Sequence, residues 1–472
     1  MIKHLLTAVL IFNSLLPAQI ASLKDTTNQF DYVIITIPEF SEYCSVFRLH
    51  KEFNRGLRVF VADTAQIYRE FTDKKTKQEN IREFISYAGT YWHSPQPKYF
   101  LILGDVTMIP NFEFVSIPNY PNTDTSRSDF FYSESIYDND SLTDFCVGRV
   151  AAGNGIEIQN YFNKVMNYES ENITERWNNR FSVIADNGFC PNRNDGDIYE
   201  RSAMRIGEEI PDYMEVKYFF ESEESRYYAD SDSVINFLNK EGSSCIYFMG
   251  RGNSEIFTCD TMFNIESFNN LENAPKYFVA SFLCAQIFSN GNSTSMLDRM
   301  LLSESGAIAG FNSVGLSYFD RNLNTTNNFF QDLYSQRETA IGEIARTILS
   351  ESYNDIKKFN LFGDPSLIIK YDITTSVRSF TDKIPDSYDL YQNYPNPFNP
   401  ATTIKFIIPK SGNIKLQVYD MLGRKIKTLI DGNIEAGYHL IRFDGSNLGS
   451  GVYLYELNSS SFNMVRKMLL IK

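Results

Sequence analysis

Short apolar runs alternate with helical patterns along the first 370 residues. Runs rich in β-branched and aromatic residues, typical of buried strands, occupy 32–37, 56–61, 99–103, 181–185, 246–249, 277–283 and 306–311. Apolar residues that recur every three or four positions predict helices over 80–92, 157–168 and most of 329–349. Strands that alternate with helices predict an α/β fold, with a parallel sheet flanked by helices.

The pattern changes after a polar linker at 373–388. Three prolines in Tyr394–Pro400 exclude a helix or a central strand there, because proline lacks the backbone donor. Alternating apolar and polar residues follow over 404–408, 414–418, 438–443, 452–457 and 464–471, with turn signals such as Asp431-Gly432-Asn433 between them. This spacing predicts a small antiparallel β-sandwich over 389–472.

The N-terminus has the pattern of a secretory signal peptide over residues 1–21. Lys3 precedes the apolar stretch Leu5–Leu16, and small residues follow at Ala18 and Ala21. The stretch is too short to span a bilayer, and no later stretch is long and apolar enough. We therefore expect a chain with no transmembrane segment that acts outside the cytoplasm and begins near Gln19 or Ser22.

Charge is unevenly distributed. The chain has a net charge of −14, while residues 389–472 hold ten Lys or Arg and six Asp or Glu, a net of +4, which leaves −18 for the rest. An acidic body argues against nucleic acid and anionic membranes as partners. It suits cationic substrates or calcium, and equally a solvated surface that keeps a secreted protein soluble.

Two of the predicted strands end at chemically notable residues. One run, 246–249, is followed by Gly250-Arg251-Gly252, and the run 277–283 is followed by Cys284. Carboxyl ends of parallel strands meet at one edge of a sheet, where sites in α/β proteins form. A cysteine nucleophile needs a neighbouring base, usually histidine, and here the neighbouring strand supplies arginine. The other five cysteines show no Cys-x-x-Cys spacing, and their disulfide pairing cannot be deduced from the sequence.

Residues 28–372 resemble the gingipain family of cysteine peptidases. The resemblance rests on Leu101–Pro110 (with Gly104-Asp105 and Ile109-Pro110), Ser128–Tyr132, Asp144–Val150 (with Gly148-Arg149) and Leu361–Leu367 (with Gly363-Asp364-Pro365). It implies a caspase-like fold with two α/β subdomains, about 28–170 and 171–372, and peptide-bond hydrolysis by a Cys/His pair.

The same resemblance places Cys284 at the nucleophile and Arg251 at the histidine of the pair. Ile287 stands where the family usually has glycine. Arginine stays protonated, so it favours a thiolate but cannot take up and return a proton. General acid–base assistance is typically worth about 10²–10⁴-fold in rate, so its loss would be severe.

Other interpretations of this pair remain open at the sequence level. Cys284 can be a buried structural cysteine. Arg251 can be a surface ion-pair residue, neutralised by Glu255 or Asp260, or a clamp for a carboxylate. Three hypotheses follow: a peptidase with an unusual base, an inactive homologue that serves as a cell-surface binding or assembly protein, and a different thiolate chemistry.

The tail resembles the type A sorting domain of the type IX secretion system. The matching segments are Tyr394–Pro400, Val418–Arg424, Leu448–Tyr453 and the basic, apolar end Arg466–Lys472. The resemblance implies export by the signal peptide and then by the type IX machinery, to the surface or the outside of a Bacteroidota-like bacterium. The alternative is a carbohydrate-binding β-domain.

No cofactor is required by the implied reaction. Two oxygen-rich loops, Asp138–Asp140 and Asn192–Asp197, have ligand types that suit calcium, which is known in the gingipain family. Neither has the complete twelve-residue EF-hand pattern, and both suit ordinary turns. A structural calcium site is therefore only one interpretation of these loops.

Overall fold

The computed structural model describes residues 21–472, apart from 75, 116–124, 139, 141, 171–174, 191–192, 196, 253–255, 258–262, 284–294, 316–318, 337, 351–353, 373–387, 394–395, 435 and 460–461. These residues form two compact units, one within Met1–Val377 and one within Arg378–Lys472. Within the described part, none of the helices combines the length and the apolar character needed to cross a membrane.

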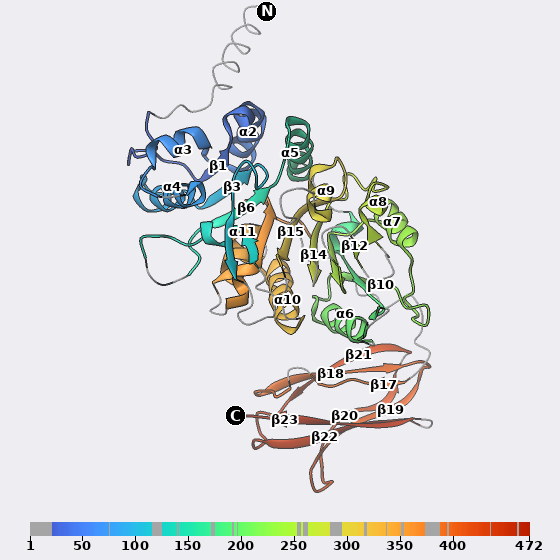
Figure 1. Cartoon of the computed structure of the whole chain (residues 1–472). Helices are drawn as coiled ribbons and strands as arrows, with labels where there is room; N and C mark the ends of the chain where they lie inside the picture. The colour runs from blue at the N-terminus through green and yellow to red at the C-terminus, as the bar shows by residue number, and fades with distance from the viewer. Residues whose placement is uncertain are drawn as a thin grey trace, which may run out of the picture. The chain divides into compact units, whose positions relative to one another are not determined.

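The first unit is built on one ten-stranded sheet (Figure 1). Its order is β10-β7-β11-β14-β15-β16-β6-β3-β1-β2. The strands are β1 (Tyr32–Thr36), β2 (Val59–Asp63), β3 (Tyr99–Leu103), β6 (Cys146–Val150), β7 (Arg180–Ala185), β10 (Glu215–Phe220), β11 (Cys245–Met249), β14 (Phe278–Leu283), β15 (Ala307–Ser313) and β16 (Phe359–Gly363). Every neighbouring pair is parallel except β15–β16. The two halves of the sheet therefore run in opposite directions.

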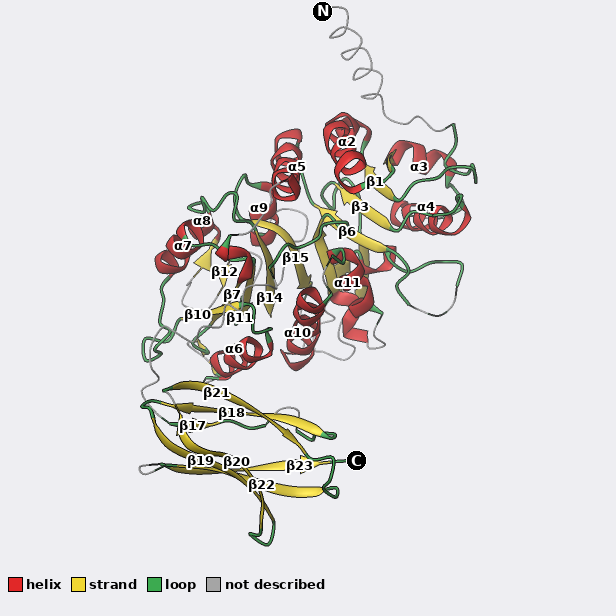
Figure 2. Cartoon of the chain, turned by 180° about the vertical axis from the view of Figure 1, so that it is seen from behind, coloured by secondary structure: helices red, strands yellow, loops and turns green. Residues whose placement is uncertain are grey.

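Helices cover both faces of this sheet (Figure 2). They are α2 (Cys44–Arg55), α3 (Thr64–Glu70), α4 (Lys77–Tyr91), α5 (Gly155–Ser170), α6 (Ile198–Glu209), α7 (Ser231–Lys240), α8 (Ile265–Phe268), α9 (Met296–Leu302), α10 (Phe319–Ser335) and α11 (Ile341–Leu349). Three two-stranded sheets are separate from the large sheet in the described part of the first unit. They pair β4 (Phe112–Val115) with β5 (Thr125–Ser128), β8 (Phe189–Cys190) with β9 (Arg193–Asn194), and β12 (Ile256–Phe257) with β13 (Phe263–Asn264).

Most inner strands of the large sheet are buried on both faces, which explains their continuous apolar sequences, whereas the edge strand β10 is largely only half-buried. In β1, Tyr32 and Ile34 join the core that includes α2 and α5, while Val33 and Ile35 join the core that includes α3 and α4. This confirms the parallel, helix-flanked sheet expected from the alternating pattern. The predicted strand at 56–61 begins later, at Val59, because Gly56 ends α2 in the left-handed conformation with φ 65°.

Three of the four motifs of the first unit converge on Arg149, which is fully buried. Its guanidinium donates to both carboxylate oxygens of Asp129, at 2.5 and 2.7 Å, and to the carbonyl oxygens of Gly104 and Ile109. The fourth motif makes a second buried contact, because Asp364 accepts hydrogen bonds from Tyr32 and Ser366. These motifs therefore hold the sheet and its connections together.

The second unit is a sandwich of two antiparallel sheets, β17-β18-β21 and β20-β19-β22-β23. The strands are β17 (Asp389–Leu390), β18 (Ala401–Ile408), β19 (Gly412–Asp420), β20 (Lys425–Ile434), β21 (Gly437–Asp444), β22 (Gly451–Asn458) and β23 (Asn463–Leu470). The sandwich was predicted, but the expected turn at Asp431–Asn433 is wrong. These residues lie within β20 and pair with Asn413–Lys415, because β19 and β20 form a long hairpin with two register shifts.

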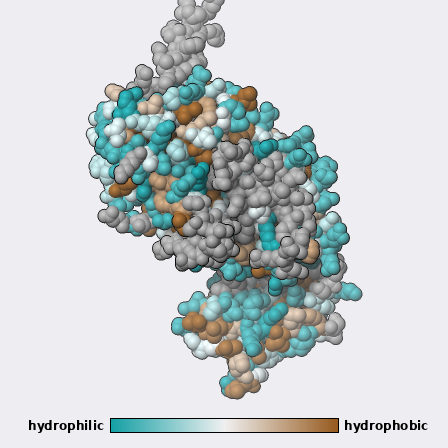
Figure 3. Space-filling view, in the orientation of Figure 1, coloured by the Kyte–Doolittle hydropathy of each residue, from teal (hydrophilic) through white to brown (hydrophobic). Residues whose placement is uncertain are grey.

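Hydrophobic patches remain on the surface of the second unit (Figure 3). Its exposed large apolar side chains are Met421, Leu422, Ile426, Val452, Val465 and Ile471. Its interior has a core of its own, formed by side chains of both sheets such as Phe406, Leu416 and Tyr455.

Candidate functional site

The candidate site lies at the carboxyl edge of β7, β11 and β14. These strands are neighbours in register, with Met249 opposite both Ala185 and Leu283. Asp186 follows β7, Gly250-Arg251 follows β11, and Cys284 is the next residue in the sequence after β14. The structure thus brings the predicted strand ends together. Cys284, Ile287, Glu255 and Asp260 lie outside the described residues.

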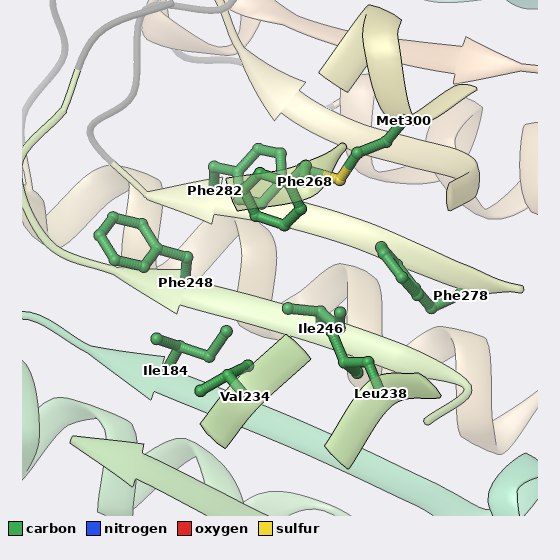
Figure 4. A pocket seen from close by; sticks show the side chains of 9 residues that line it. All are labelled: Ile184, Val234, Leu238, Ile246, Phe248, Phe268, Phe278, Phe282 and Met300. Atoms are coloured by element: carbon green, nitrogen blue, oxygen red, sulfur yellow. The ribbon is translucent and has the colours of Figure 1, made fainter. Parts of the chain in front are cut away.

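An apolar layer supports these strand ends (Figure 4). Ile184 of β7, Ile246 and Phe248 of β11, and Phe278 and Phe282 of β14 point toward α7, α8 and α9. The space left between them and Val234, Leu238, Phe268 and Met300 is about 10 Å³, too little for more than one water molecule. The strands that end at the site therefore rest on a dry, closely packed core.

The end of β14 is also fixed by a buried amide. Asn312 of β15 accepts a hydrogen bond from the N–H of Phe282 at 2.6 Å and donates to the carbonyl of Ala280 at 3.1 Å. The register between β14 and β15 shifts at Phe278/Val279, and the backbone pairing of the two strands then extends to Ala280. The Asn312 side chain bonds the backbone of β14 where that pairing ends.

Asp186 ties the ends of β7 and β11 together. This residue is almost fully buried, and its carboxylate accepts the N–H of Gly188 at 2.7 Å and the N–H of Arg251 at 3.0 Å. Gly250 is required beside it, because a Cβ there would lie 2.5 Å from the Cβ of Asp186. Nothing in the sequence marked Asp186 as part of the site except its position after a predicted strand.

The Arg251 side chain forms an ion pair with Asp195. Asp195 also accepts a hydrogen bond from Tyr199 at 3.0 Å, and its own N–H donates to the carbonyl of Gly188. Both charged side chains are largely buried. One of the open interpretations of Arg251 was an ion pair with Glu255 or Asp260, which lie outside the described residues. The partner that the structure describes, Asp195, comes from the loop that was also considered as a calcium site.

The described histidines of the first unit, His50 and His93, belong to other elements than the strands that end at this edge. His50 on α2 contacts Glu169 at 2.8 Å, and His93, after α4, contacts Gln29. His439 lies on β21 of the second unit, stacked against Phe406. None of the described residues at the ends of β7, β11 and β14 is therefore a histidine.

No group of three or more His, Cys, Asp or Glu side chains in the described part is arranged to hold a metal ion. Asp140 caps a turn through the N–H of Leu142, and Asp195 pairs with Arg251. Among the described cysteines, Cys44, Cys146 and Cys245 are free thiols in the core.

Comparison with known proteins places this geometry in a family. The family described as "Peptidase family C25" matches residues 25–370. The chain belongs to peptidase family C25. The secretion system C-terminal sorting domain matches residues 392–472, so this C25 protein carries the sorting domain that directs type IX secretion to the cell surface or the extracellular space. No curated protein matched the chain.

Solved structures of gingipain share the fold of this C25 protein. The Arg-specific cysteine proteinase gingipain R (RgpB) is 15% identical, with a TM-score of 0.60, and the alignment covers 96% of this chain and 100% of that one. The complex of the pro- and mature domains of RgpB from Porphyromonas gingivalis is 16% identical, with a TM-score of 0.57, covering 93% and 100%. At such identities the likeness shows the caspase-like fold, and the residues of the site need their own argument.

Proposed function

We propose that this protein is an exported C25 homologue that does not hydrolyse peptide bonds and instead binds polypeptides outside the cell. The observation that carries the proposal is the state of Arg251, the residue at the expected histidine position. Its backbone N–H is held by Asp186 and its guanidinium by Asp195. A guanidinium in an ion pair stays protonated, so it cannot act as a general base.

The surroundings of Arg251 support this proposal. An arginine beside a cysteine favours the thiolate, but departure of the amine from a peptide requires a proton donor. None of the described histidines belongs to the strands that end at the site. The strands that end at the site keep their packed apolar support, so the sheet of the peptidase fold is retained while its described strand ends carry no histidine.

Peptide cleavage tests the catalytic half of the proposal. Wild type, Cys284→Ala and Arg251→His are incubated with a mixed peptide library, with Arg201→His as a matched control, since Arg201 is an exposed arginine on α6. We expect no cleavage by wild type, Cys284→Ala and Arg201→His. Cleavage by wild type that Cys284→Ala abolishes would overturn the proposal and favour a peptidase with an unusual base.

Peptide capture tests the binding half. Immobilised wild type is exposed to the same library, and the retained peptides are identified by mass spectrometry. We expect enrichment of a defined set, which the variant Arg251→Ala changes and Arg201→Ala does not. A retained set identical to that of a surface without protein would refute the binding role.

A further inference from the structure

Among the described residues, Ser22, Leu23 and Lys24 make the N-terminal hydrogen bonds with the rest of the first unit. Leu23 is fully buried in the core formed by α3 and α4, and its carbonyl accepts a hydrogen bond from Nε1 of Trp92 at 2.8 Å. The carbonyl of Lys24 accepts another from Tyr87. Ala21, immediately before them, is exposed. Among the described residues, contacts with the rest of the first unit therefore begin at Ser22.

The carboxylate of Glu70 faces this segment. Glu70, the last residue of α3, accepts hydrogen bonds from Oγ of Ser22 at 2.6 Å and from the N–H of Leu23 at 2.7 Å. Its other oxygen accepts one from Gln66 at 2.9 Å. Partial burial acts to raise the pKa of Glu70, but these hydrogen bonds outweigh it and hold the pKa below its usual value.

The negative charge of Glu70 thus faces the backbone of this segment. No described Lys or Arg side chain forms an ion pair with it. The nitrogen of Ser22 lies two carbon atoms from its own Oγ and one residue before the N–H of Leu23, and both of these groups donate to Glu70, so a charged terminus at Ser22 would be within reach of the carboxylate. As an amide this nitrogen is neutral. As a chain terminus it would be an ammonium, which would add the Coulomb attraction of an ion pair to the charge-assisted hydrogen bonds that the carboxylate already accepts.

We propose that the chain is cut between Ala21 and Ser22, and that the new α-ammonium of Ser22 forms an ion pair with Glu70. The signal peptidase of the export route hydrolyses the Ala21–Ser22 bond: water supplies the hydroxyl that leaves Ala21 with a carboxylate, and the Ser22 nitrogen takes up protons to become an ammonium. The sequence left Gln19 and Ser22 as starting points. Only a start at Ser22 places a positive charge at Glu70. The inference is independent of whether Cys284 has any activity.

Few other charges bear on this ammonium. Lys24 lies with Nζ 5.0 Å from the centre of the Phe71 ring, and Asp25 is engaged with Thr27. Tyr87 of α4 faces the segment through its hydroxyl, and burial raises its pKa. The raised pKa of Tyr87 keeps its hydroxyl neutral near pH 8, where a free α-amino group titrates.

Mass spectrometry of the secreted protein tests the cleavage site. We expect an N-terminal peptide that begins with Ser22. A start at Gln19, Ile20 or any other residue would overturn the proposal.

Thermal unfolding tests the ion pair. The full chain beginning at Ser22 is compared with a form extended by Gly-Gly, which moves the ammonium away. Glu70 raises the pKa of the terminus, so its stabilisation is complete below about pH 8 and is lost as the pH rises through the raised value. We expect the extension to lower Tm by about 2–4 °C at pH 7 and to have little effect at pH 10.

Variants of Glu70 complete the test. In Glu70→Gln the Gly-Gly extension should no longer change Tm, while the control Glu39→Gln, at an exposed glutamate, should behave as wild type. Equal Tm values and equal pH profiles for the two forms of wild type would refute the ion pair, even if Glu70→Gln failed to fold.

Discussion

The main-chain N–H of Arg251 donates a hydrogen bond to Oδ2 of Asp186 at 3.0 Å. Oδ1 of the same carboxylate accepts the N–H of Gly188, and the N–H of Asp186 donates to the carbonyl of Met249. Two turns at the carboxyl edge of the sheet therefore share one buried carboxylate. The position of Arg251 depends on this residue as well as on its own strand.

Asp186→Ala should destabilise the first unit. Two buried N–H groups would lose their acceptor, which typically costs about 1–3 kcal/mol for each buried donor left unpaired. Urea unfolding measures the loss, and Glu223→Ala, at an exposed carboxylate on the same half of the sheet, serves as the control. An unchanged free energy of unfolding would show that these turns do not rely on Asp186.

Lys51 should be among the most sensitive residues of the protein. Its Nζ lies 2.5 Å from Oδ2 of Asp364 and 2.6 Å from Oε1 of Glu169, and the side chain is fully buried. Lys51→Met would leave two buried carboxylates without their common partner, at a cost of about 3–5 kcal/mol. The free energy of unfolding, with exposed Lys240→Met as control, checks this. A loss as small as that of the control would contradict it.

Much of this fold could be predicted from the sequence, for a physical reason. Strands such as β3 and β11 are buried on both faces, so their apolar runs are continuous and hard to mistake. The hairpin strand β20 escaped prediction because it is an exposed edge strand, and its Asp431-Gly432-Asn433 segment looks like a turn.

The candidate site could be predicted only in part. The carboxyl-edge rule correctly placed the ends of β11 and β14 side by side, because parallel neighbours end on one side of a sheet. The partner of Arg251 could not be found this way, since Asp195 lies in a connection whose course depends on tertiary packing. The ion pair of Asp129 and Arg149 could not be found from the sequence either, because these residues are twenty positions apart and only the folded sheet brings them into contact.

Glu215 should make the protein sensitive to acid. Burial acts to raise its pKa, but hydrogen bonds from Lys217 and Arg180 lower it to about 2. Its stabilisation is therefore present above the unfolded pKa of about 4.3 and is lost as the pH falls toward 2. Glu215→Gln should be less stable than wild type at pH 7, with the difference shrinking below pH 4. A difference that stays constant with pH would contradict this.

Asp298 should have the opposite pH dependence. Burial raises its pKa to about 6, against the effects of Ser295 and Arg149. A raised carboxyl pKa means that the folded state holds its proton longer, so stability declines as the pH rises from about 4 to 6. Asp298→Asn should therefore stabilise the protein by about 1–3 kcal/mol at pH 8 and by little near pH 4. Denaturant unfolding at both pH values tests the prediction, which fails if the variant is less stable at pH 8.

Residues 389–472 should be necessary for export and transferable to another protein. The unit has its own core, in which Leu416, Tyr455 and Leu457 are fully buried, so it can fold without the peptidase-like unit. A tagged chain truncated after residue 388 should stay inside the cell envelope. A carrier protein placed between residues 1–21 and 389–472 should reach the surface, as detected by protease accessibility of intact cells.

A point substitution can test whether export requires this unit to be folded or only to be present in the chain. Leu457→Asp places a charge in the core of the sandwich, where it has no partner, and should prevent export of the carrier. Thr428→Asp, at an exposed position of β20, provides the same charge without burial and should leave export intact. Normal surface appearance of the truncated chain, or of the Leu457→Asp carrier, would show that a folded sandwich is not what the secretion machinery requires.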